Sequence, residues 1–254
     1  MAEKKAEAVY DYILRELREK EKMHMALIDP DKQSPQKAGE KALAAALGGT
    51  SAIMVGGSTG VTQQKLDETI KAIKERVELP VILFPSGASA ITPNLDALYF
   101  MMAMNSTDPR FLVEEQAKAA PYIKKMGIET IPMGYVIVEP GMKVGEVSRA
   151  RLVKRDEAER AIGYALAAEM FGMKLVYLEA GSGADSPVPP DMIKAVREKL
   201  DPKIPLIVGG GIDGPEKART VAMAGADIIV TGTLVEKVGD VEDKIREIVE
   251  ALGR

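Results

Sequence analysis

The sequence has no cysteine, no tryptophan and only one histidine among its 254 residues. Without cysteine there can be no disulfide framework, no thiolate metal site and no cysteine nucleophile. The histidine, His24, stands near the start of a predicted strand, whereas the catalytic groups of α/β barrels follow strand ends. We interpret His24 as structural, which argues against a histidine-based catalytic triad.

Long hydrophobic runs and an excess of positive charge are missing as well. No apolar run reaches the roughly 18 residues that suggest a membrane-spanning helix, and the first 22 residues lack the apolar centre of a signal peptide. The formal net charge of −4 leaves no basic footprint for nucleic acid. We therefore expect a soluble, cytoplasmic protein with no nucleic-acid partner.

Short apolar runs alternate with helical patterns along the chain. Apolar residues make up 46% and charged residues 28%, which suits a packed core. Eight apolar runs are predicted strands, at 23–29, 51–57, 80–85, 97–104, 129–139, 174–180, 204–211 and 226–233. Helical patterns cover 35–47, 62–76, 109–126, 156–171, 189–199, 215–224 and 240–252. A further amphipathic helix at the N-terminus has Val9, Ile13, Leu14 and Leu17 on one face.

This alternation predicts a parallel sheet whose strands are covered on both faces. Eight units with no linker predict one α/β domain over residues 1–254, a (β/α)8 TIM-type barrel with an extra N-terminal helix. An open, doubly wound sheet is the competing fold. Only 11 residues, 86–96, separate the third and fourth strands. We predict an irregular segment there in place of the third helix.

Glycine-rich loops follow the last three predicted strands. Gly181-Ser182-Gly183 follows the sixth, GGG at 209–211 the seventh, and TGT at 231–233 the eighth. The carboxyl ends of barrel strands meet at one face, so these loops are predicted to lie together. Backbone N–H groups unshielded by side chains indicate a phosphate site. The alternative is that the glycines only make tight turns.

Two carboxylates stand at predicted strand ends. Asp29 ends the first strand, and Ser58, which follows the second, offers an oxygen beside it. One carboxylate with hydroxyls and substrate phosphates commonly holds Mg²⁺, although Asp29 could instead cap an Asp-Pro turn. Glu179 ends the sixth strand and is a candidate general base, or an acceptor of hydrogen bonds from a polyol. A structural salt bridge is its alternative role.

The stretch ALYFMMAMNS (97–106), which contains the fourth predicted strand, gathers aromatic and methionine side chains beside the irregular segment. One interpretation is an ordinary core strand. The other is an adaptable apolar groove, exposed by the missing helix and suited to a long apolar chain. The sequence does not separate the two.

The motifs LIDPDK, VGGS, FPS, NS, YLEAGSGA, VGGGI and TGT occur in this order. Together they resemble the geranylgeranylglyceryl phosphate synthase family and its bacterial relatives that use heptaprenyl diphosphate, over roughly residues 24–252. The resemblance implies a barrel whose third helix is replaced by a loop-like segment. It also implies transfer of a geranylgeranyl group from geranylgeranyl diphosphate to the 3-hydroxyl of sn-glycerol 1-phosphate, the first ether bond of archaeal lipids.

The resemblance also implies roles by position. Asp29 and Ser58 would bind the cofactor Mg²⁺, and Tyr177 and Glu179 would be catalytic. Substrate binding is implied for Tyr177, Leu178, Glu179, Ala180, Gly181, Ser182, Gly183, Gly209, Gly210, Gly232 and Thr233.

Two other functions are also compatible with the sequence. A sugar-phosphate isomerase or synthase would keep the phosphate site without needing a metal or an apolar groove. A non-catalytic prenyl-lipid or phosphate-binding protein would need no base. We expect a homo-oligomer, but the loop 141–156 lacks the aromatic residue of related archaeal members, so the choice between dimer and hexamer is not predicted. The first helix mixes both charge signs, so any membrane contact should be transient.

Overall fold

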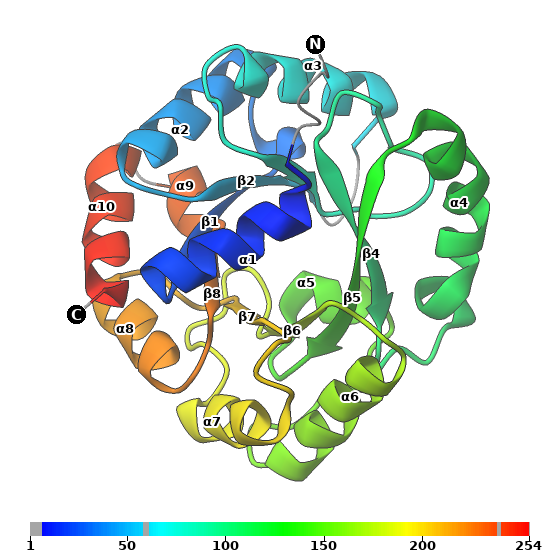
Figure 1. Cartoon of the computed structure of the whole chain (residues 1–254), viewed down its shortest axis with the longest axis vertical. Coiled ribbons are helices and arrows are strands. Elements are labelled where there is room, and N and C mark those ends of the chain that lie inside the picture. Colours follow the sequence, from blue (N-terminus) through cyan, green and yellow to red (C-terminus); the bar gives the residue numbers. More distant parts are fainter. Residues whose placement is uncertain (1–6, 58–60, 238–239, 254) are drawn as a thin grey trace.

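The computed structural model describes residues 7–57, 61–237 and 240–253. Its strands form one closed parallel barrel in sequence order, in which β1 pairs with β8 (Figure 1). The strands are β1 Met23–Ile28, β2 Ala52–Val55, β3 Val81–Leu83, β4 Ala97–Ala103, β5 Glu129–Ile137, β6 Leu175–Glu179, β7 Leu206–Gly209 and β8 Ile228–Thr231. The predicted (β/α)8 barrel is confirmed, and the open doubly wound sheet is wrong.

A ring of helices surrounds the barrel (Figure 1). Its members are α2 Pro35–Leu47, α3 Gln63–Lys74, α4 Glu115–Met126, α6 Ala158–Met170, α7 Pro190–Lys199, α8 Pro215–Met223 and α10 Val241–Leu252. Prolines at Pro35, Pro190 and Pro215 start three of them, where the missing N–H costs little. Ser34 and Thr62 cap α2 and α3 through their hydroxyl oxygens. Local signals of this kind made these helices predictable.

Four short helical segments were not predicted separately. They are η1 Pro30–Lys32, η2 Arg110–Glu114, α5 Met142–Val147 and α9 Thr233–Lys237. Six residues or fewer cannot show a helical period, which explains why the sequence did not reveal them. The segment η2 is a π-helical start to α4. The helices α5 and α9 lie in the loops that follow β5 and β8.

The connection between β3 and β4 contains no helix across residues 84–96, all of which the structure describes. In Figure 1 it runs between α3 and α4 in the ring. Asp96 fixes its end, since one carboxylate oxygen accepts the N–H of Val81 at 2.8 Å and the other accepts from Lys74 Nζ at 2.5 Å. The predicted irregular segment is therefore confirmed.

The N-terminal helix α1, Val9–Lys20, crosses the amino end of the barrel on the near side of Figure 1. The carboxylate of Glu129, at the start of β5, accepts the backbone N–H groups of Val9 at 2.7 Å and Tyr10 at 2.9 Å. The Tyr12 hydroxyl donates to the carbonyl oxygen of Ser51 at 2.8 Å. These contacts anchor α1 to distant parts of the chain.

The buried face of α1 differs in part from the predicted one. Ile13 is fully buried, but Leu14 and Leu17 stay partly exposed. Glu16 is buried instead, and Lys20 Nζ donates to its carboxylate at 2.6 Å. An ion pair one helical turn apart lets a charged side chain take a core position that the apolar pattern had assigned to leucine.

His24 lies on β1 and is buried, with its ring nitrogens 2.9 Å from the hydroxyl oxygens of Thr50 and Thr231. Burial lowers the pKa of His24 to about 3, so its imidazole is neutral at physiological pH. The histidine thus joins neighbouring strands through hydrogen bonds, as expected of a structural residue.

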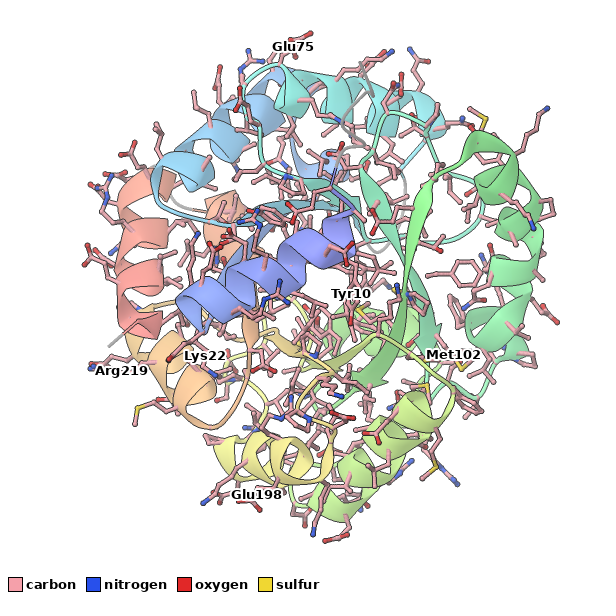
Figure 2. The ribbon with its side chains drawn as sticks, viewed as in Figure 1. Tyr10, Lys22, Glu75, Met102, Glu198 and Arg219 are labelled. Carbon is pink, nitrogen blue, oxygen red and sulfur yellow. The ribbon has the colours of Figure 1, made fainter. Side chains whose placement is uncertain are left out.

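The core has two layers. One fills the barrel, with side chains such as Met25 and Ile207, and the other lies between strands and helices, with side chains such as Val208. Charged side chains such as Glu75 and Glu198 point away from the barrel (Figure 2). Within the described ranges, no helix combines the length and hydropathy needed to cross a bilayer.

Candidate active site

The strand β6 directs alternate side chains to opposite sides of the barrel wall. Tyr177 and Glu179 line a groove at the barrel mouth. Leu178 and Ala180 pack in the outer core between strands and helices. The side chains of these last two predicted substrate-binding residues therefore do not face the mouth, because the two-residue period of a strand turns them away.

The carboxylate of Glu179 is buried at the carboxyl end of β6. Its Oε1 accepts the N–H of Gly181 at 2.6 Å, and the hydroxyls of Tyr177 and Tyr135 also hydrogen-bond to it. Burial raises the pKa of Glu179 above its ordinary value, and the three hydrogen bonds oppose that rise. No described lysine or arginine pairs with it, so the salt-bridge alternative is wrong.

The glycines after β7 make room for these groups. A Cβ atom at Gly209 would lie 2.0 Å from the hydroxyl oxygen of Tyr177, and one at Gly210 would lie 2.4 Å from Oε1 of Glu179. Gly210 also has φ +81°, a conformation that glycine adopts at no steric cost. These glycines therefore do more than turn the chain, because any side chain would displace Tyr177 or Glu179.

The predicted phosphate loops meet at the mouth. Ser182 Oγ lies 3.1 Å from Thr233 Oγ1, which joins the loop after β6 to the start of α9. Among the described residues, no acceptor receives the backbone N–H groups of Ser182, Gly183 or Gly210. Adjacent N–H groups without a protein acceptor can bind an anion. A Cβ atom at Gly232 would lie 3.4 Å from the side chain of Leu27, which also lines the groove.

Asp29 both caps η1 and faces the groove. Its Oδ1 accepts the N–H of Asp31 at 2.9 Å, and a Cβ atom at Gly57 would come within 2.4 Å of the same oxygen. Burial raises the pKa of Asp29, against the effects of the Asp31 N–H and the charge of Lys32. The turn cap weighed from the sequence is therefore present, and the same carboxylate lines the groove, while its role as a metal ligand stays a prediction.

The ammonium group of Lys32 lies beside Asp29. Lys32 Nζ lies 2.6 Å from a carboxylate oxygen of Glu236 and 3.9 Å from one of Asp29. Ser58, the other predicted metal ligand, lies outside the described residues. The described ranges contain no cluster of three or more carboxylates or histidines that could hold a metal. Asp29 fits the pattern in which one carboxylate and substrate phosphates share a Mg²⁺ ion.

The groove is partly open to solvent. Around the mouth its lining is polar, with Asp29, Lys32, Glu179, Ser182 and Glu236. Beside the irregular segment it is apolar, with Pro85, Ala88, Ile91, Leu98, Phe100, Met101, Ala119 and Ile123. Of the β4 and α4 side chains in this wall, Phe100 and Met101 are partly exposed, whereas Leu98, Ala119 and Ile123 are buried. Tyr99 is fully buried, and it lines the groove together with Phe100 and Met101, so the fourth strand contributes to both the core and the groove.

The sequence matches the model of the PcrB family over residues 15–252. The chain belongs to the PcrB family. It is 52% identical to the geranylgeranylglyceryl phosphate synthase of Methanothrix thermoacetophila over 90% of this chain and 89% of that one. It is also 52% identical to the enzyme of the same name from Thermococcus kodakarensis, over 97% and 96%.

A solved structure is similar throughout. The (S)-3-O-geranylgeranylglyceryl phosphate synthase of Thermoplasma acidophilum, in complex with its substrate sn-glycerol-1-phosphate, has a TM-score of 0.94 and 45% identity. The match covers 98% of this chain and 99% of that one. The resemblance read from the motifs is therefore confirmed at the level of the family.

Sequence reasoning missed an aromatic cluster in the barrel of this PcrB-family chain. The ring of Phe84 makes edge contacts with those of Tyr99, Tyr135 and Tyr177, at centroid distances of 6.1, 5.3 and 5.9 Å. Tyr135 lies within β5, two residues before its last residue, so the search of the residues that follow strand ends passed over it. The two-residue period of the strands could have revealed Tyr135, because it pairs with Tyr177 across β5 and β6 and its side chain points to the same inward face.

Proposed function

We propose that this PcrB-family chain transfers a geranylgeranyl group from geranylgeranyl diphosphate to the 3-hydroxyl of sn-glycerol 1-phosphate. The observation that carries the proposal is the buried Glu179, set between glycine loops suited to a phosphate and an apolar groove suited to a long hydrocarbon. The names of its relatives support the reaction, and the Thermoplasma complex supports the acceptor. A sugar phosphate would leave the groove unused.

In the reaction one C–O bond breaks and another forms. The allylic C1–O bond of the donor breaks, and diphosphate leaves with the electron pair. The 3-oxygen of glycerol phosphate gives a lone pair to C1, forms the ether bond and passes its proton to Glu179. A phosphate held by the glycine loops would fix that oxygen close to C1. The apolar groove keeps water, a competing nucleophile, away from the developing cation.

We propose that Asp29 holds Mg²⁺ together with the donor's diphosphate. The support is chemical, because a carboxylate oxygen is the hard ligand that Mg²⁺ prefers and Asp29 lines the groove. A bound Mg²⁺ would offset the negative charge that develops on the leaving diphosphate. The nearby Lys32 would add a second positive charge on that side of the mouth.

The test of function is formation of an ether product. Labelled sn-glycerol 1-phosphate, geranylgeranyl diphosphate and Mg²⁺ should yield a labelled lipid extractable into organic solvent. Glu179→Gln should lower kcat by about 100-fold or more, the usual contribution of a general base, while glycerol phosphate binding measured by calorimetry changes little. Glu146→Gln is the matched control, since that carboxylate is 72% exposed on α5. A folded wild-type protein that makes no ether product would refute the proposal.

The metal proposal has its own test. Chelation of Mg²⁺ should abolish wild-type turnover, and Asp29→Ala should remove the response to added Mg²⁺. Asp31→Ala should keep it, because Asp31 is 40% exposed and pairs with Lys65 instead. If Asp29→Ala stays dependent on Mg²⁺ at the wild-type concentration, the metal binds elsewhere.

We further propose that the protein works in the cytoplasm as a homo-oligomer. In support, Tyr122 and Met126 are 37% and 41% exposed one turn apart on α4. Apolar side chains left on a surface commonly mark interfaces. Light scattering would measure the mass of the particle, and a monomeric mass at working concentration would refute the assembly.

A further inference from the structure

Tyr135 touches the proposed base without being part of any sequence motif. It lies on β5 opposite Tyr177 of β6, and their rings meet edge to face with centroids 5.1 Å apart. Two residues further along, Glu179 shares the inward face of Tyr177. Two phenols thus form a layer directly beneath one carboxylate.

Three hydrogen-bond donors surround the carboxylate of Glu179. The N–H of Gly181 donates to Oε1, and the hydroxyls of Tyr135 and Tyr177 donate to the carboxylate. Tyr135 and Glu179 are only 2% and 7% exposed. Water therefore cannot readily take the place of a lost donor, and the carboxylate would be left with an unsatisfied hydrogen bond. Hydrogen bonds to a charged acceptor in such a site are about twice as strong as neutral ones.

Tyr135 stays protonated and can donate to Glu179. Burial and the neighbouring charge of Glu179 raise the pKa of Tyr135 well above the ordinary phenol value, so the phenol keeps its proton. The other titratable side chains that line the groove are Asp29, Lys32, Tyr99, Glu115, Lys143, Tyr177 and Glu236. Of these, only Tyr177 hydrogen-bonds to Glu179.

We infer that Tyr135 is a positioning residue, which holds the Glu179 carboxylate ionised and aimed at the acceptor hydroxyl. The hydroxyl of Tyr177 packs against Gly209, and Tyr177 belongs to the predicted acceptor site. Tyr135, in contrast, affects the reaction only through Glu179. The inference rests on the proposed function and adds a residue to its site. Removing the hydroxyl should therefore affect proton transfer more than binding.

The barrel offers a matched control. Tyr99 is fully buried and also packs against Phe84, but its hydroxyl lies 3.3 Å from the sulfur of Met25 and not near Glu179. Tyr99→Phe and Tyr135→Phe remove the same atom from the same aromatic cluster. Only the second removes a donor to the carboxylate.

Tyr135→Phe should lower kcat about 10- to 100-fold, the range expected for one hydrogen bond to a charged group. The KM for glycerol phosphate should stay within about twofold. The acidic limb of kcat/KM should move to higher pH, because loss of a donor to the ionised form raises the pKa of Glu179. Tyr99→Phe should leave that limb in place.

A double-mutant cycle separates positioning from general stability. In a Glu179→Gln background, Tyr135→Phe should cause no further loss of kcat, since the group through which it acts is gone. An equal loss in both backgrounds, or an unmoved acidic limb in the single variant, would overturn the inference. Thermal unfolding of each variant shows whether the fold is retained.

One readout does not depend on turnover. Infrared difference spectra between wild type and Glu179→Gln report the carboxylate of Glu179, and its titration should shift upward in Tyr135→Phe. If the wild type makes no ether product but this shift appears, the proposed function fails while the coupling of Tyr135 to Glu179 stands. An unchanged titration refutes the coupling.

Discussion

Gly210 has φ +81°, and a Cβ atom there would lie 2.4 Å from Oε1 of Glu179. Gly172, at the end of α6, has a similar φ of +75°, but a Cβ atom there meets nothing within 4 Å. Alanine at either position must adopt a left-handed conformation at a cost of about 1–2 kcal/mol. Only at position 210 does the new methyl group also press on the proposed base.

We therefore expect Gly210→Ala to lose more unfolding free energy in urea than Gly172→Ala, because its methyl group also meets Glu179 and the backbone of Gly181. Gly210→Ala should in addition lower kcat by about 100-fold, because a displacement of roughly 1 Å at the reacting groups has that effect. Gly172→Ala should keep nearly full activity. Equal activity of the two variants would show that contact with Glu179 is unimportant.

Single residues also show where sequence reasoning reached its limit. Glu179 and the glycines after β6 and β7 could be predicted, because strand ends in a barrel share one face. Tyr135 could not, because its role depends on which distant atoms the closed barrel brings within hydrogen-bond distance. The cap function of Asp29 is local, and the sequence had offered it as an alternative. Leu178 was assigned to the site by motif alone, although the strand period points its side chain the other way.

Among the elements, the irregular segment 84–96 and α4 together form the wall of the apolar groove. Glu115 on α4 joins them, since its carboxylate accepts the N–H of Ala88 at 2.7 Å and Arg110 Nε at 2.8 Å. These hydrogen bonds hold the pKa of Glu115 below its ordinary value, with that from Ala88 the largest cause. The groove therefore owes part of its shape to one carboxylate.

Glu115→Ala should loosen this wall. We expect a loss of about 1.5–3 kcal/mol in the free energy of unfolding, because the side chain is largely buried and its bonds are charge-assisted. The KM for geranylgeranyl diphosphate should rise, while that for glycerol phosphate stays the same. Glu114→Ala, at the exposed neighbouring residue, is the control. A rise in both KM values would instead indicate a general disturbance of the mouth.

The elements themselves differed in how far the sequence revealed them. Long helices with prolines or capping hydroxyls at their starts were predicted within a few residues. The helices α5 and α9 were missed, because five or six residues show no period. The missing third helix was evident from chain length alone, since 11 residues cannot cross back over the sheet with a full helix.

For the whole molecule, the barrel has one open end. The helix α1 covers the amino ends of the strands, and the groove opens at their carboxyl ends and continues beside β4 and α4. A hydrocarbon can therefore leave the mouth sideways instead of passing through the barrel. The length of prenyl chain that fits depends on this lateral path, which no single motif in the sequence specifies.

The anchoring of α1 also bears on the order in which the molecule folds. Its hydrogen bonds reach Glu129, Ser51 and Lys174, at sequence separations of 120, 39 and 164 residues. The surface that receives α1 exists only after β1, β5 and β6 have come together. Contacts between residues so far apart form late, because the loops that they close are long. The helix α1 is thus among the last elements of the barrel to dock.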